Sequence, residues 1–384
     1  MPQPDRAGER PRVSLVLHKF SRGGSDRVAA YLANGFRDAG MDVEMTVLCR
    51  GGEVENYLVD IVEDIPIRYL GSASRSRGWD LVRTFPALVA HLRAMQPAAV
   101  VSTANNTALA SALAVRAAGL AHRARLLLKT TNPIASSRHR GLIRWLRRAS
   151  YSLIFRWTDS VWTLSADESE EMRQAFPRFR SIFRDVFNPY VTPAMLEPLG
   201  GVETQVQTVI SIARLTEQKR LDRLIAAFAH VRDPRTRLLI LGEGDDRQAL
   251  ARQVAELGLT DRVSMPGYVP DVARALHESD LFILTSEYEG LPAAVLEAMA
   301  ANCPVLCTDC FPAARTLLQS ADGCAIIEDV GPEALARQIE AALNAPRPTA
   351  LRAIAERYSI ENGVRSHVEA LLQALSTPRP PEEQ

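Results

Sequence analysis

The 384-residue sequence contains no long apolar run. No apolar stretch reaches the roughly 18 residues of a membrane-spanning helix, and the polar start MPQPDRAGER has no apolar signal core. We therefore expect a cytoplasmic protein. Cysteine is also scarce, with five residues, an odd number that argues against a disulfide framework. Because Cys303, Cys307 and Cys310 have no histidine or fourth cysteine at ligand spacing, we expect buried free thiols and no metal site.

Lysine is rare, and the charges are unevenly distributed. Only Lys19, Lys129 and Lys219 occur, and the net charge of zero combines +9 for residues 1–190 with −9 for the remainder. Between Asp80 and Asp159 there are twelve arginines or lysines and no acidic residue. Such a basic region favours an anionic partner. We do not expect nucleic acid to be that partner, because the chain shows no recognised module for it.

The chain alternates short apolar segments with longer helical ones, a pattern typical of parallel sheets flanked by helices. Its length and its 47% hydrophobic content suit two domains, each with its own core. We therefore predict two doubly wound α/β domains in tandem. The expected strands are 12–17, 43–48, 98–102, 124–129 and 160–164 in the first half, and 208–213, 237–241, 262–265, 281–285 and 304–307 in the second.

A segment rich in proline, glycine and polar residues predicts the domain boundary. We expect a first domain at 1–190, a linker at 191–206, and a second domain at 207–348. We expect helices at 349–376, which either stay with the second domain or return to the first. Residues 377–384 should form a disordered tail.

Ligands of open parallel sheets bind outside the carboxyl ends of the strands. After the first strand, Gly23 and Gly24 precede a helix expected to begin near Arg27; their backbone either approaches an anion or forms a tight turn. In the second half, Arg214 and Lys219 follow a buried strand and precede a helix. They suit a diphosphate, and solvated surface charges are the alternative.

The segment SEYEGLPAAVLEAMA carries the strongest pattern. Glu289 follows a strand, Pro292 is expected in the first turn of a helix, and Glu297 lies inside that helix. These carboxylates can accept hydrogen bonds from sugar or ribose hydroxyls, while the backbone N–H groups at the helix start suit a phosphate. The alternative for Glu297 is an exposed helix residue, which its apolar neighbours disfavour.

Together, the motifs GG–x–x–R, R–L–x–x–x–K, G–E–G–D and E–G–L–P–x–x–x–L–E–A–M–A resemble the retaining glycosyltransferases of family 4 (group 1), in this order along both halves. The resemblance implies the GT-B fold of two facing Rossmann-like domains. It also implies a nucleotide sugar on the second domain, an acceptor on the first, and transfer with no cofactor and no essential metal.

The resemblance also implies roles for individual residues. Arg214 and Lys219 would hold the donor diphosphate, Glu297 the ribose and Glu289 the transferred sugar. The remaining donor contacts would come from Gly23, Gly24, Tyr268, Val269, Gly290, Leu291 and Pro292. This chain lacks the first-domain histidine that many relatives place after the strand at 98–102, so Asn105, Asn106 and Asn132 remain weaker candidates for contact with sugar or acceptor.

The stretch 138–157 contains six arginines together with tryptophan and aliphatic residues. This composition suits an anionic membrane surface, which would make the protein peripheral on the inner face of the cytoplasmic membrane. The alternative is a packed domain helix with a solvated arginine face. The residues expected at the membrane are Arg140, Arg144, Trp145, Arg147 and Arg148.

Two functions stay open. The first is a retaining transferase that moves a hexose or N-acetylhexosamine, from UDP by preference, to a glycan or lipid-linked acceptor in surface polysaccharide synthesis. The second is a nucleotide-sugar-binding regulatory or partner subunit without transferase activity, which the missing histidine leaves possible. A nicotinamide dehydrogenase is excluded, because Arg247 stands where the third glycine of G–x–G–x–x–G would be.

Overall fold

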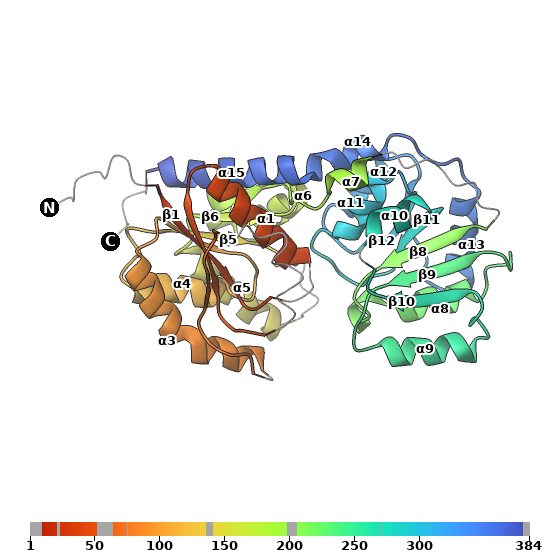
Figure 1. Cartoon of the computed structure of the whole chain (residues 1–384), viewed down its shortest axis with the longest axis horizontal. Coiled ribbons are helices and arrows are strands. Elements are labelled where there is room, and N and C mark those ends of the chain that lie inside the picture. The colour runs from red at the N-terminus through yellow and green to blue at the C-terminus, as the bar shows by residue number, and fades with distance from the viewer. Residues whose placement is uncertain are drawn as a thin grey trace. The chain divides into compact units, whose positions relative to one another are not determined.

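The computed structural model describes residues 10–20, 24–51, 64–74, 76–135, 141–197, 206–269 and 271–378. The chain divides into two compact units. The first comprises residues 1–189 and 361–384, and the second comprises residues 190–360. Figure 1 shows that each unit is built from a twisted sheet with helices on both of its faces. The predicted α/β class with two Rossmann-like domains is confirmed.

The sheet of the first unit has seven strands, all parallel, in the order β3-β2-β1-β4-β5-β6-β7. Central strands such as β5, with sequence RLLLK, are covered on both faces, so their apolar residues run on without alternation. The strands are β1 (Arg12–Leu17), β2 (Asp42–Val47), β3 (Ile67–Tyr69), β4 (Ala99–Ser102), β5 (Arg125–Lys129), β6 (Ser160–Thr163) and β7 (Phe183–Asp185).

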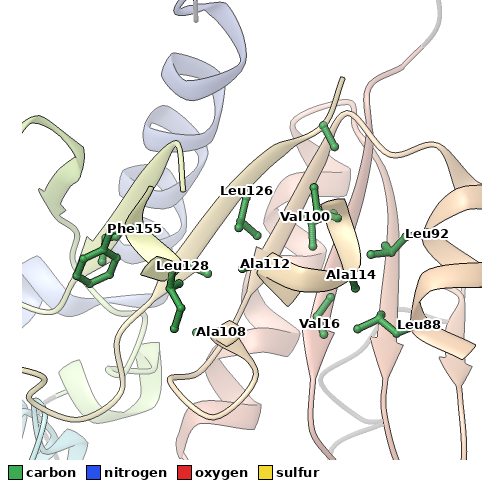
Figure 2. Close-up of a cluster of buried hydrophobic side chains, with 14 of the residues drawn as sticks. Val16, Leu88, Leu92, Val100, Ala108, Ala112, Ala114, Leu126, Leu128 and Phe155 are labelled. Carbon is green, nitrogen blue, oxygen red and sulfur yellow. The ribbon is translucent and has the colours of Figure 1, made fainter. Parts of the chain in front are cut away.

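Helices cover both faces of this sheet. On one face, α3 and α4 pack against each other, and Figure 2 shows Leu88 and Leu92 of α3 directed toward the same core as Val16 and Val100 of the strands. The helices are α1 (Gly24–Asp38), α3 (Arg77–Met95), α4 (Ala108–Ala117), α5 (Leu142–Phe155), α6 (Ala166–Ala175), the 3-10 helix η1 (Pro177–Ile182) and α15 (Ile360–Ser376).

The second unit repeats this plan with six parallel strands in the order β10-β9-β8-β11-β12-β13. Its strands are β8 (Thr208–Ile212), β9 (Arg237–Leu241), β10 (Val263–Gly267), β11 (Leu281–Leu284), β12 (Val305–Thr308) and β13 (Cys324–Ile327). Its helices are α7 (Pro193–Leu196), η2 (Glu217–Lys219), α8 (Leu221–Phe228), α9 (Arg247–Glu256), α10 (Val272–His277), α11 (Ala293–Ala300), α12 (Ala314–Gln319), α13 (Pro332–Leu343), α14 (Leu351–Ala355) and η3 (Glu356–Tyr358).

Some local details differ from the sequence-based expectation. The strands β3, β7 and β13 were not expected; each is only three or four residues long and lies at the edge of its sheet. Helix α1 begins at Gly24, three residues before the expected start. The expected linker includes a bridge at Val191 to Ser359 and the helix α7, both within the second unit. Residues 361–384 belong to the first unit.

Helix α15 is anchored in the first unit by a buried histidine. His367 is fully buried, its Nδ1 lies 2.8 Å from the carbonyl oxygen of Gly363, and its ring meets the edge of Trp162 at 5.3 Å between ring centroids. Burial lowers the pKa of His367 to about 3, so the imidazole is neutral in the folded protein. The C-terminal helix is thus an integral part of the first unit.

The cysteines are free thiols, as expected. Four of them are buried, whereas Cys324 is partly exposed. Burial raises the pKa of both Cys303 and Cys324 to about 12, so these two thiols stay protonated at neutral pH. Within the described residues, no helix is both long enough and apolar enough to cross a lipid bilayer.

Candidate functional site

The order of strands in the second unit reverses between β8 and β11. From β8 the chain moves outward through β9 to β10, then returns to pair β11 with the other side of β8. The loops that leave these two strands lie at the point where the strand order reverses, which is where open α/β sheets bind ligands. Arg214 and Lys219 follow β8, and residues 287–292 follow β11, so both predicted motifs lie at this position.

Two glycines hold the loop that carries Arg214. Gly242 has a φ of +136°, and a Cβ there would lie 2.0 Å from the carbonyl oxygen of Ala213. A Cβ on Gly244 would lie 2.2 Å from the carbonyl oxygen of Leu215. Only glycine permits so close a backbone approach. The G–E–G–D turn thus packs directly against the backbone of this loop. The side chain of Arg214 is exposed.

Lys219 and Glu289 meet at the mouths of the two strands. Lys219 Nζ lies 2.5 Å from Glu289 Oε1, and both side chains are largely buried. The backbone N–H of Glu289 donates to the carbonyl oxygen of Cys310 at 2.7 Å, which fixes the residue from the side of β12. The alternative interpretation of Lys219 as a solvated surface charge is therefore wrong.

Hydrogen bonds to backbone groups join the loop after β8 to the loop after β11. The N–H of Glu287 donates to the carbonyl oxygen of Gln218 at 2.9 Å, and Gln218 Nε2 donates to the carbonyl oxygen of Tyr288 at 2.7 Å. Thr285 Oγ1 donates to the carbonyl oxygens of Lys219 and Arg220 at 3.2 and 3.1 Å. Sequence analysis missed Gln218 and Thr285. Thr285 directly follows β11, whereas Gln218 lies six residues beyond the end of β8, and no motif singled out either residue.

Glu297 lies in the second turn of α11 and is only 4% exposed. The exposed alternative for this residue is thus wrong. Gly290, Leu291 and Pro292 are buried in the turn before the helix. Pro292 is the N-cap of α11 and not a residue of its first turn, and its ψ of 114° is extended, so the helix begins at Ala293. The first turn of α11 leaves backbone N–H groups at its start, as every helix does.

The remaining residues predicted to contact the donor do not lie beside Lys219 and Glu289 in the chain. Tyr268 is exposed and Val269 is partly exposed; both follow β10, the edge strand two positions from β8. In the first unit, Gly24 starts α1 in open surroundings, where a Cβ would have no atom of the described residues within 4 Å. Gly23 lies outside the described residues.

The asparagine candidates come together in the first unit. Asn105, after β4, donates from Nδ2 to the carbonyl oxygen of Asn132 at 2.8 Å, and its Oδ1 accepts from the N–H of Thr131 at 2.9 Å. The loops after β4 and β5 are thereby tied together. Asn106 adjoins them, and its Oδ1 is buried with no hydrogen-bond partner among the described residues. Lys129 offers nothing to this surface, because it is buried beside Glu168, and its burial lowers its pKa to about 7.

The residues of the basic segment lie in different surroundings. Arg140 lies outside the described residues, and Arg144 and Trp145 are exposed on α5. Arg147 and Arg148 instead bind their own unit, donating to the carbonyl oxygens of Pro133 and Ala175. A guanidinium carries several donors in a fixed fork, so it readily satisfies nearby carbonyl groups. In the first two turns of α5 the exposed side chains are the apolar Leu142, Ile143, Trp145 and Leu146 together with Arg144 and Arg148.

Two family models match the chain, one in each half. "Glycosyl transferase 4-like domain" matches residues 23–182, and "Glycosyl transferases group 1" matches residues 200–361. The matched segments include the loop at Gly24 and the motifs around Arg214 and Glu289.

Among curated relatives, an uncharacterized glycosyltransferase of Methanocaldococcus jannaschii is 29% identical over 206 residues, which is 50% of each chain. The GDP-mannose:cellobiosyl-diphosphopolyprenol alpha-mannosyltransferase of Xanthomonas oryzae is 30% identical over 51% of this chain and 57% of the relative. The alignments thus span about half the length of these two relatives.

Among solved structures, that of HepE from Anabaena, in complex with UDP and glucose, superposes with a TM-score of 0.75 and 19% identity. The match covers 95% of this chain and all of that one, so the two share their fold. With two Rossmann-like units, a family match to each, and this fold, the chain belongs to the group 1 glycosyltransferases of the GT-B fold.

Proposed function

We propose that this protein is a retaining glycosyltransferase that moves a hexose or N-acetylhexosamine from a nucleotide sugar, by preference a UDP-sugar, to a glycan or lipid-linked acceptor in surface polysaccharide synthesis. The observation that carries the proposal is the pairing of Lys219 with Glu289 at the strand reversal of the second unit. It places a fixed cation and a carboxylate with a second oxygen together in the crevice where such a sheet binds its ligand.

The charges at this position suit a sugar nucleotide. Arg214 and Lys219 supply two cations for the diphosphate, one able to bind in a fork and one as a point charge. Glu289, held by Lys219 and by the backbone of Cys310, is assigned to the hydroxyls of the transferred sugar. Glu297, buried on α11, is assigned to the ribose hydroxyls.

The reaction needs no covalent help from the protein. The bond between the anomeric carbon and the diphosphate oxygen breaks, and the acceptor oxygen attacks the same face. The acceptor's proton passes to the leaving diphosphate. Arg214 and Lys219 stabilise the negative charge that grows on that diphosphate, an effect that is strongest where the donors are already in place. No first-unit base is required in this scheme, which accommodates the missing histidine.

Two similar proteins support a nucleotide sugar as the donor. The Xanthomonas protein is named for transfer of mannose from GDP-mannose to a diphosphopolyprenol-linked disaccharide, and the Anabaena structure contains UDP and glucose. GDP-mannose and UDP both contain a nucleoside diphosphate, the group for which the two cations of the second unit are suited.

The test is a two-part screen with the full chain. UDP-, GDP- and ADP-sugars are compared by thermal shift, where a ligand at 100 times its Kd should stabilise the fold by about 2.7 kcal/mol. The stabilising donor is then followed for release of nucleoside diphosphate with polyprenol-linked and free glycan acceptors. We expect a UDP-sugar to stabilise and to turn over. Stabilisation without turnover on any acceptor would favour the partner-subunit alternative, and no stabilisation by any donor would refute donor binding.

We further propose that the first unit docks on an anionic membrane through α5. Leu142, Ile143, Trp145 and Leu146 are each more than half exposed, and Arg144 is exposed among them. No acidic residue lies between Asp80 and Asp159 to oppose anionic lipid. Apolar side chains combined with a basic residue are typical of an interfacial helix, and each arginine near such a surface contributes about 1 kcal/mol.

Sedimentation with liposomes tests the docking. At low salt the protein should pellet with vesicles containing phosphatidylglycerol and stay in solution with phosphatidylcholine alone. Pelleting should fall in 1 M salt, where the Debye length is about 3 Å. Trp145→Ser should reduce pelleting with anionic vesicles, whereas Arg365→Glu, on α15, serves as a control with a larger change of charge. Equal, negligible pelleting of the unaltered protein with both lipids at low salt would end this proposal.

A further inference from the structure

Three buried side chains of different chemistry meet in the first unit. His18 directly follows β1, Cys49 lies just beyond β2, and Asp80 lies in the first turn of α3. Their exposed fractions are 8%, 0% and 2%. Among the residues that the structure describes, they form the one group of histidine, cysteine and acidic side chains found able to share a metal ion.

The spacing of the donor atoms is close to that of a tetrahedral site. His18 Nε2 and Asp80 Oδ2 are 3.4 Å apart, and all three donor atoms lie within 4.8 Å of one another. In a tetrahedral zinc site, bonds of 2.0–2.3 Å place neighbouring donor atoms about 3.3–3.6 Å apart. The His18 and Asp80 atoms already have this separation. The Cys49 thiol, at up to 4.8 Å, has to approach the other two donor atoms by up to about 1.3 Å.

The surroundings hold these groups in place. The other carboxylate oxygen of Asp80, Oδ1, accepts a hydrogen bond from the N–H of Ser74 at 2.7 Å, and this leaves Oδ2 directed at His18. The N–H of Cys49 donates to the carbonyl oxygen of His18 at 2.9 Å, which joins the ends of the two strands. Ligands oriented by such outer hydrogen bonds are a regular feature of protein metal sites.

We propose that His18, Cys49 and Asp80 bind a zinc ion that joins the ends of β1 and β2 to the start of α3. One thiolate, one imidazole and one carboxylate are a donor set that suits zinc, with a water in the fourth position. As the metal–sulfur bond forms, the Cys49 thiol releases its proton to solvent. The thiolate and carboxylate then offset the two positive charges of the ion.

The position suggests a structural role. The three residues come from segments 31 residues apart along the chain, and an ion would cross-link them at the carboxyl edge of the sheet. His18 also lies six residues before Gly24, in the loop that leads into α1. The bound ion takes no part in glycosyl transfer in this proposal, so its test does not depend on the proposed activity.

The experiment uses the full chain, freed of any histidine tag, stripped with a chelator and titrated with zinc or cobalt alone. After gel filtration, bound metal is counted by mass spectrometry, and cobalt is followed by its thiolate charge-transfer absorption. The variants are Cys49→Ser and Asp80→Asn. The matched control is Cys303→Ser, which removes an equally buried thiol from the second unit.

We expect one ion per chain in the unaltered protein and in Cys303→Ser, with a cobalt–thiolate band in both and a higher Tm on adding zinc. Cys49→Ser and Asp80→Asn should lose at least about tenfold in affinity, and Cys49→Ser should lose the band. No retained ion in the unaltered protein, or the same retention in Cys49→Ser, would refute the site. If Cys49→Ser does not fold, the test rests on the unaltered protein. The absence of a cobalt–thiolate band in the unaltered protein would also refute the site.

Discussion

Replacing Lys219 with alanine is expected to lower kcat/KM for the nucleotide-sugar donor by about 1.5–3 kcal/mol, or roughly 10- to 150-fold, the range for a charge-assisted hydrogen bond. The ammonium group is largely buried and held 2.5 Å from Glu289, so it is already positioned before a diphosphate arrives. Nucleoside diphosphate release, measured against donor concentration, reports the change.

The same substitution leaves the buried carboxylate of Glu289 without its cation, which destabilises the fold. The thermal unfolding of each variant is therefore measured, and kinetics are compared well below its Tm. Arg232→Ala is the matched control, because it also removes a cation paired to a carboxylate in the second unit, Glu340, at an exposed position. Unchanged donor kinetics in folded Lys219→Ala would remove Lys219 from the site.

Changing Glu297 or Glu289 to glutamine should impair two different properties, nucleotide binding and turnover respectively. Glu297→Gln should weaken binding of the free nucleoside diphosphate by roughly 10- to 150-fold, because a charged acceptor for the ribose hydroxyls becomes neutral. Glu289→Gln should mainly lower kcat, because Glu289 is assigned to the sugar that reacts, and nucleoside diphosphate lacks that sugar.

Calorimetric titration with nucleoside diphosphate and steady-state kinetics separate the two effects. Glu256→Gln, an exposed residue of α9, gives a control with the same chemical change. If free nucleotide binds Glu297→Gln as tightly as the unaltered protein, the ribose assignment is wrong. If Glu289→Gln retains its kcat, the sugar contact belongs to another residue.

The main strands of both sheets could be predicted because strands covered on both faces are continuous apolar runs, as in LLL of β5 and LFIL of β11. Parallel strands also place the loops that follow them at one edge, so Arg214, Lys219 and Glu289 could be assigned there from their positions alone. The edge strands β3, β7 and β13 carried no such signal, because each is short and partly exposed.

Side-chain partners could not be predicted in the same way. Arg147 and Arg148 contribute to a basic composition whether they face a membrane or their own unit, and the structure directs both to backbone carbonyl groups of the first unit. The same packing leaves the apolar side chains of Leu142, Ile143, Trp145 and Leu146 exposed. Which residues of an amphipathic helix remain uncovered depends on the neighbouring elements, which local sequence does not specify.

The sequence by itself determined the α/β class, the two domains, the loops to which the site is assigned and the family resemblance, since all of these rest on local periodicity and on motifs read along the chain. Only the tertiary structure decided the order of the strands, and with it the contact of Lys219 with Glu289 beyond the ends of β8 and β11. The same holds for His18, Cys49 and Asp80, which no sequence spacing connects. They meet because β1 pairs with β2 in the sheet and the first turn of α3 lies beside the ends of these two strands. Such contacts between distant segments form only when the chain packs.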